Sequence, residues 1–92
     1  MKPNVSMFLH TDGIPPLTVD SMRGYFLHGH RPGGFLYAVL SNNLIGACQR
    51  ADSANNVALY DIMRFLNVRA PIGSWGSPEA VTKWLKDFHK AA

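Results

Sequence analysis

Two glycine-containing loops, each placed directly before helical sequence, carry the residues best suited to bind a ligand. The first loop contains Arg31, Gly33 and Gly34, and the second contains Trp75 and Ser77. Glycine lets a ligand approach the backbone closely, and the first turn of a helix presents unpaired N–H groups with a partial positive charge. A loop of this kind can hold an anion. We therefore predict that these loops bind a phosphate or carboxylate group.

Arginine and aromatic side chains would complete such a site. The planar guanidinium of Arg31 can pair with a phosphate through two hydrogen bonds, and Arg23 and Arg69 are secondary candidates for this role. The indole of Trp75 can stack on a nucleotide base, while the N–H groups of the glycines surround a phosphate. Structural roles also fit these residues. A Pro-Gly sequence can end a helix, Trp75 can pack against the helix that it precedes, and each arginine can lie on a solvated helix face.

Patterns for catalysis or metal binding are weak. His28 and His30 stand one residue apart at the expected end of a helix, and no cluster of cysteine or carboxylate residues completes a zinc site with them. The chain contains neither a P-loop nor a Gly-x-Ser-x-Gly motif, and its six acidic residues are spread along the sequence. The single cysteine, Cys48, lies in an apolar helical stretch and is expected to be buried. We therefore expect no enzymatic activity, no metal site and no cofactor.

The composition indicates one small domain. The chain has 92 residues, of which 47% are hydrophobic, and a domain of this size buries only roughly 60–65% of its unfolded surface. Formation of a homo-oligomer would be a natural source of further stability. The net charge of +3 is lower than that of dedicated nucleic-acid binders. The sequence has no run of 18 apolar residues and no signal-peptide pattern, which predicts a soluble intracellular protein without membrane contact.

The spacing of apolar residues predicts an all-α fold. We expect a compact bundle of four to five short helices over residues 17–92, after an irregular N-terminal arm over residues 1–16. The first helix is expected to begin near Thr18, as its cap, and to end at Gly29. The polar residues 41–43 interrupt the next helical run, either as a break between two helices or as a polar face turned to a ligand.

The remaining elements are marked by capping residues and by the arm. Asp52 and Ser77 are expected to cap the two later helices, the first of which ends near Asn67. Pro78 suits the first position of the last helix because its missing N–H leaves no hydrogen bond unmade there. Residues 5–9 could form a short strand, and the arm could pack on a neighbouring subunit.

Several segments form a distinctive pattern when they are considered together. They are Pro32-Gly33-Gly34-Phe35-Leu36, Asn56-x-Ala58-Leu59 and Ala70-Pro71-x-x-x-Trp75-Gly76-Ser77. With these segments, the chain from about residue 17 to residue 85 resembles a family of small uncharacterised proteins encoded by tailed bacteriophages. Asn43 departs from the family pattern, which has an acidic residue there. The resemblance implies a phage protein that acts in the host cytoplasm, and it implies no particular reaction.

Three functions remain open. Small phage proteins commonly bind and block, so the first is anti-defence: sequestration, without catalysis, of a nucleotide second messenger of bacterial immunity, such as a cyclic oligonucleotide or a cyclic ADP-ribose derivative. The second is inhibition of a host or immune protein by direct contact, which predicts an exposed apolar patch. The third is DNA binding by a small helical module, for which the best recognition helix, over residues 53–67, offers only Arg64, Asn55 and Asn56.

Overall fold

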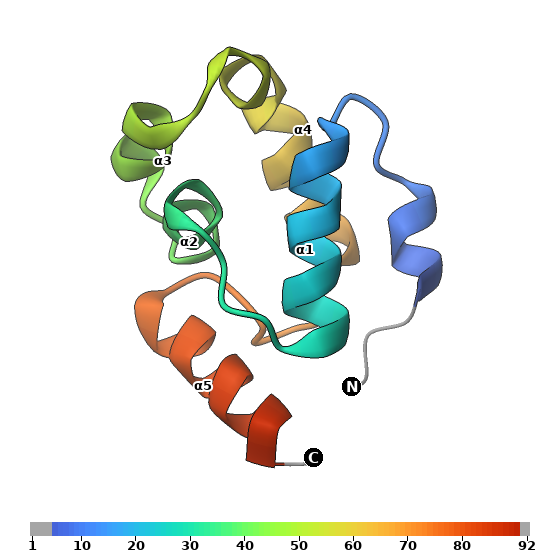
Figure 1. The fold of residues 1–92 in the computed structure, drawn as a ribbon, viewed down its shortest axis with the longest axis vertical. Coiled ribbons are helices and arrows are strands. Elements are labelled where there is room, and N and C mark those ends of the chain that lie inside the picture. The colour runs from blue at the N-terminus through green and yellow to red at the C-terminus, as the bar shows by residue number, and fades with distance from the viewer. Residues whose placement is uncertain (1–4, 91–92) are drawn as a thin grey trace.

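The computed structural model describes residues 5–90, and the regular elements in this range are all helices (Figure 1). A short 3-10 helix, η1 (Val5–Leu9), comes first. The α-helices that follow are α1 (Pro16–His28), α2 (Gly34–Leu40), α3 (Leu44–Arg50), α4 (Ser53–Arg69) and α5 (Pro78–Lys90). The prediction of an all-α fold with four to five short helices is confirmed.

Helix α1 stands in the middle of this arrangement. In Figure 1, η1 lies along one side of α1, α2 and α3 lie on the other side, and α4 runs behind it. Helix α5 lies below α2, close to the C-terminal end of α1. Because of this placement, the connection from α1 to α2 and the helix α5 come together although they are far apart in the sequence.

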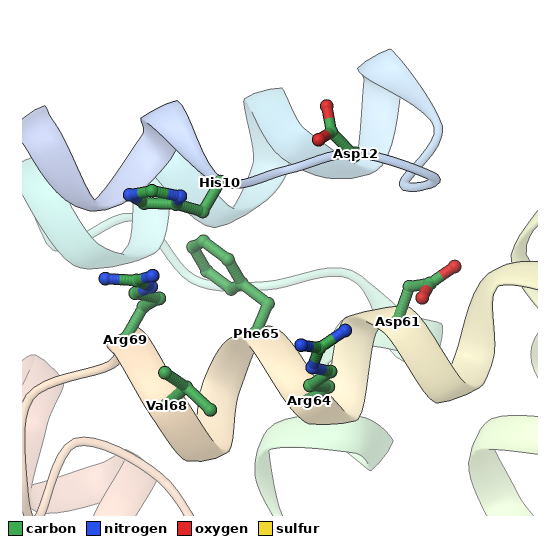
Figure 2. A pocket seen from close by; sticks show the side chains of 7 residues that line it. All are labelled: His10, Asp12, Asp61, Arg64, Phe65, Val68 and Arg69. Atoms are coloured by element: carbon green, nitrogen blue, oxygen red, sulfur yellow. The ribbon is translucent and has the colours of Figure 1, made fainter.

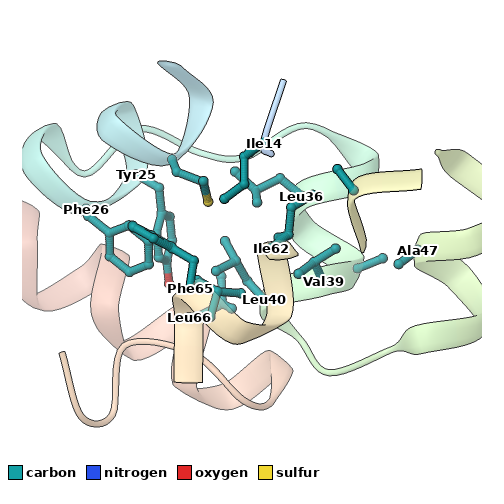
Figure 3. Close-up of a cluster of buried hydrophobic side chains, with 14 of the residues drawn as sticks. Ile14, Tyr25, Phe26, Leu36, Val39, Leu40, Ala47, Ile62, Phe65 and Leu66 are labelled. Atoms are coloured by element: carbon teal, nitrogen blue, oxygen red, sulfur yellow. The ribbon is translucent and has the colours of Figure 1, made fainter. Parts of the chain in front are cut away.

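The core lies mainly between α1, α2 and α4 (Figure 3). The largest fully buried side chains are apolar or aromatic: Tyr25, Phe26, Met22, Leu40, Ile62, Leu66, Val39 and Val81. Each side chain of this size contributes about 1.5–3 kcal/mol when it leaves water. Val81 is the one fully buried residue of α5, and the half-buried Trp84 and Leu85 of the same helix also pack against the core.

The N-terminal segment packs on the core of its own chain. The strand considered for residues 5–9 is wrong, because these residues form η1 and bury Met7 and Phe8. The rings of Phe8 and Phe65 are 5.7 Å apart between centroids, and Ile14 is also buried. A strand would need a partner strand for its backbone groups, and a helical turn satisfies them locally. Residues 1–4 of the expected arm lie outside the described residues.

Three short polar side chains cap helices by accepting backbone N–H groups. Asn43 accepts from Gly46 at 2.9 Å, Asp52 accepts from Asn55 at 2.8 Å, and Ser77 accepts from Ala80 at 3.0 Å. The expected caps at Asp52 and Ser77 are therefore confirmed. The polar interruption at residues 41–43 is a break between α2 and α3 rather than a polar face within one helix.

Two local expectations are corrected. Thr18 does not cap α1, because the helix already begins at Pro16, and the hydroxyl of Thr18 instead donates to the side-chain oxygen of Asn55. Cys48 is exposed rather than buried. Helix α3 spans only seven residues and buries Gly46 and Ala47, so its apolar sequence is longer than the face that it can bury.

Candidate functional site

The structure does not bring the seven predicted ligand-binding residues together within one chain. They are distributed over five places. Arg31 lines one hollow, Gly33 and Gly34 line a second, Arg69 lines a third, Trp75 and Ser77 lie before α5, and Arg23 lies over the ring of Phe8 at 4.8 Å. Each place is therefore judged by its own chemistry.

The loop with Trp75 and Ser77 serves the fold. The N–H group of Gly76 donates to the carbonyl of Leu40 at 2.7 Å, and Ser77 caps α5. The carbonyl of Ser74 accepts the hydroxyl of Tyr25 at 2.6 Å. Trp75 is half-buried and packs against the core. Since these groups already have partners within the chain, the loop connects α1, α2 and α5 and offers little to a ligand.

Gly33 and Gly34 line a small hollow at the start of α2. Its volume is about 250 Å³, and residues of α1 and Asn55 complete its wall. The side chain of Arg50 lies beside this helix start, since a Cβ at Gly34 would be 3.4 Å from its Cδ. The volume is below the 300–1,000 Å³ that is typical of small-molecule sites, and α2 has only seven residues.

A third hollow lies between residues 10–12 and α4 (Figure 2). It has a volume of about 220 Å³ and is lined by His10, Asp12, Asp61, Arg64, Phe65, Val68 and Arg69. Figure 2 shows the side chain of Arg69 rising from α4 toward His10, whereas that of Arg64 lies in front of α4. Because two carboxylates accompany the two guanidiniums, the attraction for an anion is largely cancelled here.

The largest of these hollows, about 780 Å³, lies between the α1–α2 connection and α5. We call it the basic hollow. It is lined by Gly29, His30, Arg31, Pro32, Tyr37, Val81, Thr82, Leu85, Lys86 and His89. None of these lining residues is acidic, and the volume lies within the typical range for small-molecule sites. Among residues 5–90 the one ion pair joins Lys83 to Asp87, so neither Arg31 nor Lys86 forms an ion pair with a described carboxylate.

Gly29 fixes the shape of the basic hollow. It ends α1 in the left-handed conformation, with φ 65° and ψ 28°, and both Gly29 and His30 donate their N–H groups to the carbonyl of Gly24. This ending is common where a helix must turn sharply, and glycine adopts it without a steric penalty. The turn directs residues 30–32 toward α5.

Side-chain hydrogen bonds hold α5 against the end of α1. The indole N–H of Trp84 donates to the carbonyl of Tyr25 at 3.0 Å. Nε2 of His89 lies 2.8 Å from the carbonyl oxygen of Gly29, and since a carbonyl only accepts, Nε2 carries the proton. Asp87 is exposed, and its hydrogen bond from Lys83 lowers the pKa of its carboxyl group. The acid nearest in sequence to the basic hollow is thus engaged with another lysine.

The basic hollow combines the groups that recognise a phosphorylated aromatic molecule. Arg31 offers a planar donor fork and Lys86 offers a compact charge, both suited to phosphate oxygens. Tyr37 is 42% exposed, so a flat base could stack on its ring, and Leu85 supplies apolar surface to the same hollow. No group of three or more His, Cys, Asp or Glu residues within residues 5–90 could hold a metal ion.

Sequence reasoning identifies only Arg31 of this set. It misses Tyr37, which lies in the first turn of α2 directly after the connection, and also Lys86 and His89, which tertiary packing brings to the connection from α5. A local signal exists on α5, where Lys86 and His89 are spaced by three residues and so lie on one face beside Leu85. The sequence alone favours a solvent-facing role for that lysine.

Comparisons of this chain with protein-family models, with curated proteins and with solved structures found no match. None of the helices over residues 5–90 combines the length and the apolar character needed to cross a membrane.

Proposed function

We propose that this chain binds a phosphorylated nucleotide in the basic hollow and sequesters it without converting it. The observation that carries the proposal is the charge of the lining: Arg31, Lys86 and two histidines surround a volume of about 780 Å³ that no acidic residue lines. Such a surface attracts phosphate, and a nucleotide supplies both phosphate and an aromatic base.

Each lining group has a role in this proposal. Arg31 and Lys86 pair with phosphate oxygens, and Tyr37 stacks on the base. The backbone N–H of Arg31 lies beside the phosphate, because those of Gly29 and His30 already donate to Gly24 and Pro32 has none. The proposed contact in this loop is therefore Arg31 rather than Gly33 and Gly34. We assign the lining residues to binding alone, so the ligand is expected to be retained unchanged.

The biological setting is proposed from the resemblance to small proteins of tailed bacteriophages. A phage protein that removes a nucleotide signal of bacterial immunity, such as a cyclic oligonucleotide or a cyclic ADP-ribose derivative, would protect the phage in the host cytoplasm. An open hollow on a 92-residue chain suits this task, because sequestration needs affinity and abundance rather than turnover.

Calorimetric titration tests the proposal with a panel of linear and cyclic nucleotides, the matching nucleosides and inorganic phosphate. We expect a cyclic or linear nucleotide to bind and to be recovered intact, and the nucleosides to bind much more weakly. Arg31→Ala and Lys86→Ala should each weaken binding roughly 10- to 100-fold, because a charged hydrogen bond contributes about 1.5–3 kcal/mol.

Two matched variants serve as controls. Lys90→Ala removes a charge from α5 outside the basic hollow, and Arg69→Ala removes a guanidinium from the hollow of Figure 2. Both should bind like the unmodified chain. Failure of every nucleotide to bind would overturn the proposal, and so would an equal loss of affinity in Arg69→Ala and Arg31→Ala.

Inhibition of a host protein by direct contact is the second candidate. The observation in its favour is the exposed apolar surface of α4, where Val57 and Tyr60 are 87% and 74% exposed. DNA binding is less well supported, because a helix that reads bases needs polar groups where α4 exposes these side chains.

A further inference from the structure

Helix α4 carries a row of side chains along one side, of which Asp61 is half-buried and the others are exposed. Val57, Asp61, Arg64 and Val68 follow one another at spacings of four, three and four residues, and Tyr60 lies beside Asp61. We call these five residues the α4 stripe. The spacing places them along one side of the helix, as in the seam of a helical pair. Val57, Tyr60 and Val68 are 87%, 74% and 59% exposed, so large apolar groups on this side contact water.

The α4 stripe is complementary to itself. Its two ends are both valine, and its middle holds one acid and one base. Consider two antiparallel α4 helices related by a two-fold axis that crosses them at the level between Ile62 and Met63. Val57 and Val68 are equally far from this level along the helix, so Val57 lies opposite the partner's Val68. For the same reason Asp61 lies level with the partner's Arg64. Each contact therefore occurs twice, as the symmetry of a closed dimer requires.

We propose that the α4 stripe is the interface of a homodimer in which two α4 helices pack antiparallel. The charges select this orientation, because a parallel pair would place Asp61 next to the partner's Asp61 and Arg64 next to the partner's Arg64. In the antiparallel pair, Tyr60 also lies within reach of the partner's Arg64 guanidinium, and an aromatic face attracts such a cation.

The expected partner is a second copy of this chain, because the order of valine, acid, base and valine along the α4 stripe is complementary to the same order read in the opposite direction. A different protein would need no valine at both ends and no opposite charges at equal distances from one axis. Helix α4 has 17 residues and is about 25 Å long, so a single helix pair buries less than a standard stable interface. The dimer is accordingly weak and depends on concentration. The basic hollow contains no residue of α4 and stays outside this interface.

A charge-swap experiment tests this geometry. Arg64→Glu places a carboxylate opposite the partner's Asp61, and Asp61→Lys places an ammonium group opposite the partner's Arg64, so each variant alone repels itself. In a mixture of the two, unlike chains meet with opposite charges at these positions, and the repulsion is relieved. We expect sedimentation equilibrium over about two decades of concentration to show a dimer for the unmodified chain, monomers for each variant, and a dimer again for the mixture.

Circular dichroism shows whether the variants fold, which matters because the carboxylate of Asp61 packs closely on Gly13. Val57→Asp provides a second test at a highly exposed position, and it should abolish the dimer of the unmodified chain without loss of helicity. A monomer at every concentration would overturn the proposal. A dimer that persists in Arg64→Glu and Val57→Asp, or a mixture that stays monomeric although both charge variants fold, would do so as well.

Discussion

Replacement of Gly29 by alanine tests how the end of α1 is joined to α5. Gly29 has φ 65°, a backbone conformation that costs an alanine residue roughly 1–2 kcal/mol. A Cβ at this position would also lie 2.7 Å from Cδ1 and 2.8 Å from Cγ of Phe88. Since ordinary carbon contacts are about 3.5–4.0 Å, the Phe88 ring must move by close to 1 Å.

The displaced ring would disturb the C-terminal half of α5. Phe88 packs edge-on against Trp84, with 5.9 Å between ring centroids, and the neighbouring His89 donates to the carbonyl of Gly29. Loss of part of this packing and of one hydrogen bond adds about 1–2 kcal/mol to the backbone term. We therefore expect Gly29→Ala to lower the free energy of unfolding by about 2–4 kcal/mol.

Gly33→Ala is the matched control, because it makes the same change four residues later. Gly33 has φ −72° and ψ 178°, and a Cβ there would meet nothing within 4 Å. Alanine there reduces the entropy of the unfolded chain but is a poorer N-cap of α2 than glycine, so the free energy of unfolding should change by less than about 1 kcal/mol in either direction. Urea unfolding followed by circular dichroism gives both values. Equal stabilities for Gly29→Ala and Gly33→Ala would refute both the left-handed turn and the contact with Phe88.

Two further predictions concern single hydrogen bonds. Burial raises the pKa of Tyr25 well above its usual value of 10.0. Above about pH 10 the folded chain therefore keeps a proton on Tyr25 that the unfolded chain releases. The free energy of unfolding then falls by up to about 1.4 kcal/mol per pH unit. Tyr25→Phe should make this alkaline decline in stability less steep, although it also removes the hydrogen bond to Ser74 at neutral pH. Urea unfolding between pH 9 and about pH 12 measures stability against pH for both chains. Equal slopes for the variant and the unmodified chain would contradict the prediction. Ser77→Ala should lower the free energy of unfolding by about 1 kcal/mol in thermal unfolding, because α5 loses its cap. The control is Ser53→Ala, next to the capping Asp52, which should change stability by less than about 0.5 kcal/mol. Equal effects of the two variants would count against the cap at Ser77.

Features that depend on neighbouring residues could be predicted from the sequence. The caps at Asp52 and Ser77 and the end of α1 at Gly29 follow from the hydrogen bonds and backbone freedom of those residues alone. The first residue of α1 could not be predicted from the sequence in the same way. Thr18 is a good capping residue, but its hydroxyl contacts Asn55, far along the chain, and that contact cannot be inferred from local spacing.

The candidate site depends on packing between distant segments, so the sequence identifies it only in part. Arg31 is recognised from its loop, yet its neighbours Lys86 and Tyr37 come from α5 and α2. Trp75 and Ser77 are predicted to contact the ligand because an aromatic residue and a helix start suit one. The structure instead gives Ser77 to the cap of α5 and packs Trp75 against the core. The sequence is compatible with both a ligand-binding and a structural role for Trp75 and Ser77, and the positions of α1 and α2 are needed to decide between them.

The position of α5 gives the basic hollow one more property. This helix packs Val81, Trp84 and Leu85 on the core, and two side-chain hydrogen bonds join it to the carbonyls of Tyr25 and Gly29. A ligand that contacts both Arg31 and Lys86 would link α5 to the α1–α2 connection. Its binding free energy would then be added to the interactions that hold α5 against the rest of the chain. Chains with such a ligand would resist cellular proteases longer than empty chains, so the amount of this protein would rise with the amount of any molecule that binds there.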